Sequence, residues 1–117
     1  MPLEAPPVDI ASLWWGQLVA FVARIQWVMR RNPGARATSW WRSETKNREV
    51  GGSPVSQHLV GLGADFVVHF GSRIQFVNDL RAAGLVPVEE LNHVHVQLFP
   101  AGVASASIRA TMVRIKV

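Results

Sequence analysis

Apolar residues recur at intervals of three and four between residues 10 and 29, which places them on one side of a helix. The turn sequence Asn32-Pro33-Gly34 ends this helix near Arg31. The stretch is long enough to cross a bilayer, but Arg24 within it is costly in lipid, so we interpret it as a buried amphipathic helix and not as a membrane span. Its apolar positions are Ile10, Leu13, Trp14, Leu18, Phe21, Ile25 and Val28, and we also assign Trp15 and Trp27 to the core.

The remaining pattern predicts short strands and a second helix. Strands are expected over residues 35–41, 65–70, 85–89 and 93–99, and residues 42–55 are polar and are expected to form a loop. The second helix is predicted over residues 72–83, capped by Ser72 and ended by Gly84. The residues expected on its buried side are Ile74, Phe76, Val77 and Leu80. This order of elements predicts an α+β fold in which helices pack on a mainly antiparallel sheet.

Composition narrows the class of protein. The chain has 117 residues, 49% of them hydrophobic, which suits one globular domain with an extended lead-in over residues 1–8 and a basic segment over residues 103–117. The net charge is +4, but the basic residues are scattered and no nucleic-acid-binding signature is present, so nucleic acid is not an expected partner. Cysteine is absent, so a transition metal would need His, Asp or Glu as ligands.

One such set of ligands is suggested by the spacing of His58 and Asp65, which lie seven residues apart and are separated by small and apolar residues. Imidazole nitrogen and carboxylate oxygen are good zinc donors, and a site with three protein ligands leaves a position for water. His95, on an alternating strand, is the candidate third ligand. His93 lies on the same face of that strand and is the alternative.

A wider motif surrounds these residues. It comprises Thr38-Ser39-Trp40-Trp41-Arg42-Ser43, Asn47, Gly51-Gly52, Ser56, His58, Gly61, Ala64, Asp65 and the late segment Val94-His95-Val96. From about residue 37 to residue 97, the chain resembles the zinc D-alanyl-D-alanine carboxypeptidases and L-alanyl-D-glutamate endopeptidases, whose fold is shared with hedgehog signalling domains. The resemblance implies this hedgehog/DD-peptidase-like fold and hydrolysis of a peptide bond in the stem peptides of bacterial peptidoglycan.

The resemblance also implies roles for individual residues. His58, Asp65 and His95 would bind Zn²⁺, Arg42 would stabilise the peptide carbonyl or a substrate carboxylate, and Ser56 would be a nearby hydrogen-bonding residue. Small members of this family that lack a signal sequence are often phage lysis or virion proteins. The expected location is therefore cytoplasmic until host lysis, or in the virion, because no signal peptide is identified at the N-terminus.

The residue at the expected position of the general base differs from the family pattern. The family commonly places an acid three residues before the last histidine, and Asn92 stands there in this chain. Glu90 is our first candidate for the base and Glu89 the second. The spacing of Glu90 and His93 also allows a shifted register in which His93 is the ligand. If neither glutamate reaches the metal, the alternative function is a catalytically inactive zinc-binding module that binds the wall or forms part of a virion.

Overall fold

A four-stranded antiparallel sheet with the strand order β1-β2-β4-β3 organises the chain in this computed structural model, which describes residues 3–4, 15–53 and 56–100. The strands are β1 (Ala35–Ser39), β2 (Gly63–Val68), β3 (Val86–Glu89) and β4 (Val94–Gln97). The helices are α2 (Trp15–Arg31), α3 (Glu44–Glu49), the 3-10 helix η2 (Gln57–Val60) and α4 (Arg73–Ala82). The structure therefore confirms the predicted α+β fold with a mainly antiparallel sheet.

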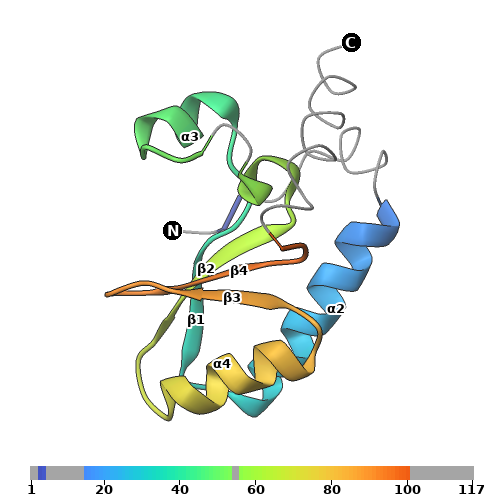
Figure 1. Ribbon diagram of the computed structural model, residues 1–117, viewed down its shortest axis with the longest axis vertical. Coiled ribbons are helices and arrows are strands. Elements are labelled where there is room, and N and C mark those ends of the chain that lie inside the picture. The colour runs from blue at the N-terminus through green and yellow to red at the C-terminus, as the bar shows by residue number, and fades with distance from the viewer. Residues whose placement is uncertain (1–2, 5–14, 54–55, 101–117) are drawn as a thin grey trace.

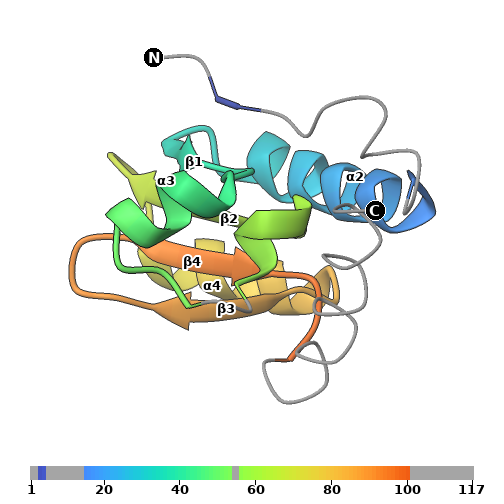
Figure 2. The same ribbon diagram turned by 90° about the horizontal axis from the view of Figure 1, so that it is seen from above.

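The helices α2 and α4 lie next to each other against the strands, while α3 lies at the end of the molecule opposite α4 (Figure 1). Figure 2 shows α3 and η2 together, on a different side of the sheet from α4. The core between the sheet and the two longer helices is built from Phe21, Phe66, Phe76, Leu80 and Val96, each almost fully buried. Burying such side chains is the main stabilising contribution to a fold of this size.

Strand alternation separates this core from the polar face of the sheet. Val94 and Val96 of β4 point into the core, so His95 between them points to the opposite face. Phe66 of β2 is likewise in the core, which leaves Asp65 on the same face as His95. Asp65 and His95 are direct partners in the β2–β4 register. The sheet thus presents a carboxylate and an imidazole side by side on its polar face.

Both predicted helix ends are confirmed. The α2 helix ends at Arg31, and the side chain of Asn32 donates to the Val28 carbonyl at 2.9 Å. The α4 helix begins after Ser72, whose hydroxyl accepts from the Gln75 backbone N–H at 3.1 Å. Residues 10–14 and the tail from residue 103 lie outside the described residues. No helix in the described ranges is sufficiently long and apolar to span a membrane.

The prediction of a loop over residues 42–55 is wrong for its first half, which contains α3. The Ser43 hydroxyl accepts from the Lys46 backbone N–H at 3.1 Å and caps this helix. Asn47 is buried and its side-chain amide donates to the Ser53 carbonyl at 2.8 Å. Gly52 lies so close to Asn47 that a Cβ there would meet the Asn47 Oδ1 at 2.1 Å. These contacts fix a helix that has no apolar periodicity.

The burial predicted for three apolar side chains is also wrong. Ile74 is 74% exposed, and Trp15 and Trp27 are 64% and 40% exposed. Ile74 is the second residue of α4, on the side turned away from the sheet. The Trp27 ring instead carries the Arg31 guanidinium, 5.1 Å from the ring centroid, as a cation–π contact.

Candidate metal centre

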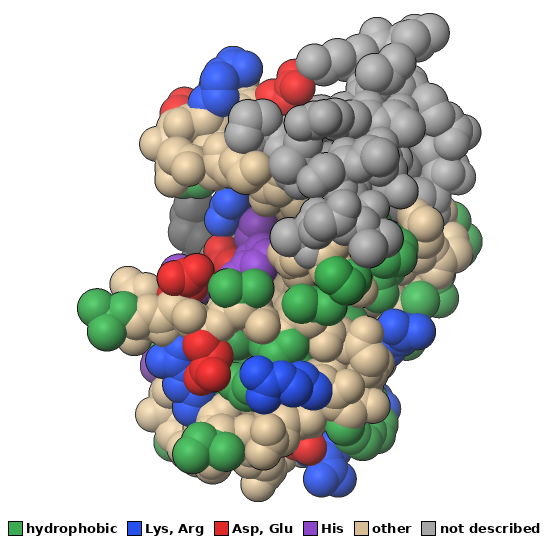
Figure 3. All heavy atoms as spheres, viewed as in Figure 1, with side chains coloured by type: hydrophobic (Ala, Val, Ile, Leu, Met, Phe, Trp, Pro, Cys, Tyr) green, Lys and Arg blue, Asp and Glu red, His purple; other side chains and the backbone are tan. Residues whose placement is uncertain are grey.

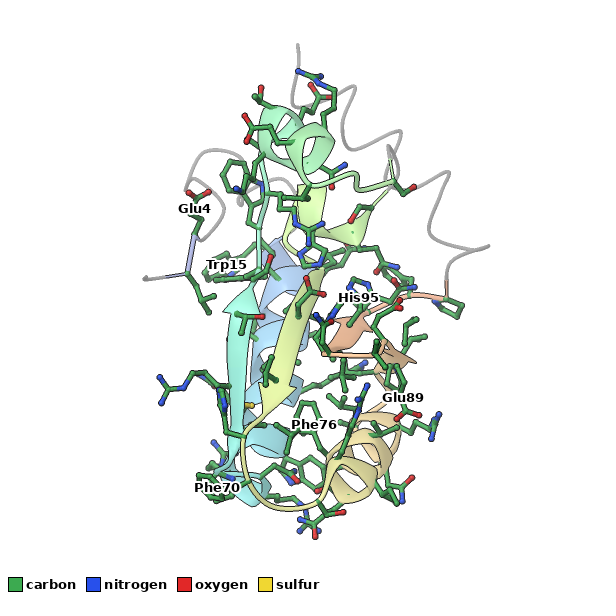
Figure 4. The ribbon with its side chains drawn as sticks, turned by 90° about the vertical axis from the view of Figure 1, so that its left-hand side faces the viewer. Glu4, Trp15, Phe70, Phe76, Glu89 and His95 are labelled. Atoms are coloured by element: carbon green, nitrogen blue, oxygen red, sulfur yellow. The ribbon has the colours of Figure 1, made fainter. Side chains whose placement is uncertain are left out.

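Three potential metal ligands meet on the polar face of the sheet. His58 comes from η2, Asp65 from β2 and His95 from β4. The Asp65 Oδ1 lies 3.3 Å from the His58 Nε2 and 3.0 Å from the His95 Nδ1, and the two nitrogens are 3.2 Å apart. Figure 4 shows His95 well apart from the core residue Phe76. The structure therefore brings together all three residues that the sequence nominated for zinc.

The backbone around His58 explains how this histidine reaches the sheet. Ser56 precedes η2, and its hydroxyl accepts from the His58 backbone N–H at 3.2 Å. Gly61 ends the turn with φ of 73°, a left-handed conformation that suits glycine. A Cβ on Gly63 would come within 3.1 Å of the His58 backbone nitrogen. The two glycines thus let the chain reverse tightly enough to set the buried His58 ring opposite Asp65.

The hydrogen bonds of the two imidazoles fix which nitrogen faces the cluster. The His58 Nδ1 lies 2.5 Å from the Trp40 carbonyl, so it carries the proton and donates to that oxygen. The His95 Nε2 lies 2.8 Å from the Gln97 Oε1, and the Gln97 amide nitrogen donates to the Phe99 carbonyl at 2.8 Å. This orients the Gln97 oxygen toward His95. Both histidines consequently turn their other ring nitrogen, the one not used in these outer hydrogen bonds, toward Asp65.

The Asp65 carboxylate connects the cluster to Arg42. Its Oδ2 accepts from the Arg42 Nη2 at 2.9 Å, while its Oδ1 faces the two histidines. Burial acts to raise the pKa of Asp65, but the hydrogen bonds from His58 and His95, together with their charges, outweigh burial and hold the pKa well below its usual range. Asp65 is therefore an anion throughout the neutral pH range.

This donor set fits a divalent zinc ion. The inner nitrogens of the two rings and the Asp65 carboxylate oxygen lie 3.0–3.3 Å apart, so with both nitrogens unprotonated their lone pairs would repel one another and the carboxylate unless a cation lay between them. A shared proton or a metal ion satisfies all three. Two histidines and one carboxylate form a typical three-ligand set of catalytic zinc sites, and each histidine here has the outer hydrogen-bond acceptor that such ligands usually have.

A cleft of about 610 Å³ opens over the three ligands. The α3 side of this cleft is formed by Val50 and the Gly51-Gly52-Ser53 turn, and the opposite side by Glu90 and His93. Figure 3 shows histidine side chains at the base of this hollow, with basic and acidic side chains beside them. The cleft is therefore polar and charged at its base.

The two candidate glutamates lie in different places. Glu90 lines the cleft, whereas the Glu89 carboxylate lies 3.6 Å from the Arg73 Nε and does not line it. Figure 4 likewise shows Glu89 beside α4 and apart from His95. His93 also lines the cleft, with its Nε2 3.9 Å from the Asp65 Oδ1, but His95 is the histidine that completes the three-donor cluster. The positions thus favour Glu90 over Glu89 and His95 over His93.

Gln97 is the site residue that sequence reasoning missed. It is a buried polar residue on the same face of β4 as His95, two positions further along, and that alternation was the available signal. Gln57, also buried, donates to the same Phe99 carbonyl at 2.6 Å and accepts from the Phe99 backbone N–H at 3.0 Å. The two glutamines together fix the chain after β4 and the orientation of the His95 ring.

Replacing Gln97 by leucine is expected to weaken zinc binding by roughly ten- to a hundredfold, the usual cost of losing the outer partner of a ligating histidine. The His95 ring would lose its acceptor for Nε2–H and its preferred tautomer. Gln97→Glu keeps an acceptor at this position and is expected to retain zinc. Competition titrations with a chromogenic chelator measure both affinities. Equal affinities for wild type and Gln97→Leu would contradict this role.

Comparison with known proteins agrees with this geometry. The model of the peptidase M15 family matches residues 26–97, which is more than half of the chain and includes all three candidate ligands. Neither the curated proteins nor the solved structures gave a match to the chain. Members of the matched family are zinc-dependent, and the His-Asp-His cluster is a group of residues that could bind a metal ion. This chain belongs to the peptidase M15 family.

Proposed function

We propose that the protein is a zinc metallopeptidase that hydrolyses a peptide bond in the stem peptides of bacterial peptidoglycan, of the D-Ala-D-Ala carboxypeptidase or L-Ala-D-Glu endopeptidase type. The observation that carries this proposal is the convergence of His58, Asp65 and His95 at the base of an open cleft. Membership of the peptidase M15 family supports the reaction class. His58, Asp65 and His95 are the residues that would hold zinc, which supplies a Lewis acid and lowers the pKa of bound water toward about 7.

Glu90 is the proposed general base. It lines the cleft on the side opposite the Gly51-Gly52 turn, where a carboxylate can take a proton from the attacking water and return it to the leaving amine. Within the part of the cleft lining that the structure describes, Glu90 and Asp65 are the acidic residues. Asp65 already contacts the two candidate histidine ligands and Arg42. This leaves Glu90 as the carboxylate available for proton transfer.

Arg42 and Ser56 are the proposed substrate-binding residues. Arg42 is anchored by Asp65 and by a longer contact of 3.4 Å to the Asn47 side chain, and its guanidinium borders the cleft. A fixed positive charge at this position stabilises the negative charge that develops on the carbonyl oxygen. The Ser56 hydroxyl accepts from the His58 backbone, so its own hydrogen remains to donate to a substrate carbonyl.

A second candidate function is a zinc-binding module without turnover, and Asn92 is the observation that favours it. An amide stands where the family commonly has an acid, and the Asn92 Oδ1 lies 2.7 Å from the His93 Nδ1. An amide cannot act as a base. In that case the cleft would bind wall peptides, or serve assembly, without cleaving them.

The two functions are separated by one experiment on the purified full chain. Zinc is quantified, and peptidoglycan is incubated with the protein while free D-alanine and newly exposed amino groups are measured. We expect one equivalent of zinc and product release that is lost on treatment with a chelator and restored by added zinc. Zinc without product would favour the binding module, and a protein that binds no zinc would contradict both proposals.

A further inference from the structure

One arginine outside the cleft holds the turn that carries the proposed base. Arg73 is the first residue of α4, and its Nη2 donates to the carbonyl oxygens of Glu90 and of His93, the latter at 2.9 Å. Its Nη1 donates to the Leu91 carbonyl at 3.5 Å. A single guanidinium therefore donates hydrogen bonds to three carbonyl oxygens of the β3–β4 turn, residues 90–93.

This turn needs such an anchor because it projects from the sheet. Leu91 at its tip is 98% exposed, and a backbone hydrogen bond from the Glu90 N–H to the His93 carbonyl at 2.9 Å closes the hairpin. Hydrogen bonds from a charged donor are stronger than neutral ones, and the planar guanidinium presents its N–H groups in a fixed fork. Arg73 thus fixes the backbone of both Glu90 and His93, the two residues on this side of the cleft.

We infer that Arg73 is a positioning residue for the reaction: it holds the β3–β4 turn so that the Glu90 carboxylate faces the cleft above His58, Asp65 and His95. The inference rests on the proposed function, in which Glu90 carries the proton. Arg73 itself does not line the cleft, so it acts through the turn and not on the substrate.

The carbonyl contacts, and not the nearby ion pair, carry this role. The Arg73 Nε lies 3.6 Å from the Glu89 carboxylate, which is within ion-pair range but too long for a hydrogen bond, and this Nε has no hydrogen-bond partner. The Glu89 side chain is 54% exposed, and exposed ion pairs contribute little. Glu89→Gln is therefore a matched control, because it removes the ion pair and leaves the three carbonyl contacts in place.

The test compares wild type with Arg73→Met, Arg73→Lys and Glu89→Gln as full-length, zinc-loaded proteins. We expect Arg73→Met to lower kcat by up to roughly a hundredfold, the cost of misplacing a reacting group by about 1 Å, with KM and zinc content near those of wild type. Arg73→Lys should recover part of kcat, since an ammonium group can reach some of the carbonyls. Glu89→Gln should behave as wild type.

Hydrogen exchange supplies a readout that does not depend on turnover. The Glu90 backbone amide should exchange faster in Arg73→Met, while the amides of β2 stay protected and Glu89→Gln resembles wild type. If wild type shows no turnover, the proposed function fails, and the exchange data still decide whether Arg73 holds the turn. An unchanged kcat, unchanged Glu90 exchange, or a Glu89→Gln variant as impaired as Arg73→Met would each overturn the inference. Loss of zinc and of β2 protection in Arg73→Met would also overturn it, because the role would then be general stability.

Discussion

Replacing His58 by alanine is expected to abolish zinc binding and peptide hydrolysis together. His58 is buried, its Nδ1–H donates to the Trp40 carbonyl, and its Nε2 faces Asp65 and His95. Removing a direct ligand should weaken zinc binding by more than the roughly ten- to hundredfold that the loss of an outer partner costs. Zinc content by atomic emission and product release from peptidoglycan measure the two losses.

Thermal unfolding adds a second measurement of the same prediction. A ligand that binds only the folded state stabilises it by about 2.7 kcal/mol when its free concentration is a hundred times its Kd. Added zinc should therefore raise the melting temperature of the wild type and leave that of His58→Ala unchanged. His69→Ala is the matched control, because His69 is an exposed histidine at the end of β2 and outside the cluster. A His58→Ala protein that binds zinc as tightly as His69→Ala would contradict the assignment of the site.

The elements predicted best from sequence are those whose signals are local. Ser72 and Gly84 mark the two ends of α4, and each acts on backbone close to it in the sequence. The Ser72 hydroxyl accepts a backbone N–H of the first turn, and Gly84, just beyond the helix, has a φ of 78°. The alternation of apolar and polar residues from Val94 to Gln97 likewise marked β4 and put His95 on the polar face.

The α3 helix could not be predicted in this way because its stability comes from distant contacts. Six residues are too few to form a helix without support, and α3 has no apolar stripe. Asn47 holds it through a hydrogen bond to Ser53 and through the close approach of Gly52, which only the folded turn creates. The glycine pair signalled a turn in the sequence, but not the side chain that the turn encloses.

The ligands of the candidate site could be nominated from sequence, while the residues that orient them could not all be identified. Imidazole and carboxylate groups are the usual zinc ligands in a chain without cysteine. The spacing of His58 and Asp65, combined with the surrounding motif, therefore indicated a metal site. Gln97 and the Trp40 carbonyl act through hydrogen bonds whose partners become neighbours only when η2, β1 and β4 meet. Arg42 was expected at the substrate, and the structure adds that it also donates a hydrogen bond to the candidate ligand Asp65.

Replacing Glu90 by glutamine is expected to lower kcat by about 10²- to 10⁴-fold, the usual contribution of a general base, while zinc binding is retained. The side chain keeps its size and its place at the cleft but can no longer accept a proton. Glu89→Gln is the natural control, because Glu89 lies beside Arg73 and does not line the cleft. Steady-state kinetics on a soluble stem peptide, with zinc quantified in the same samples, measure the effect.

The combination of results identifies the group that carries the proton. Loss of kcat in Glu90→Gln with full activity in Glu89→Gln would establish Glu90 as the base. The carboxylate on the β3–β4 turn would then do the work of the acid that the family commonly has at the position of Asn92. Full activity in Glu90→Gln would contradict this assignment and direct attention to His93, which shares that side of the cleft and lies 3.9 Å from Asp65. Because zinc is measured alongside, a loss of activity through loss of the metal cannot be mistaken for loss of the base.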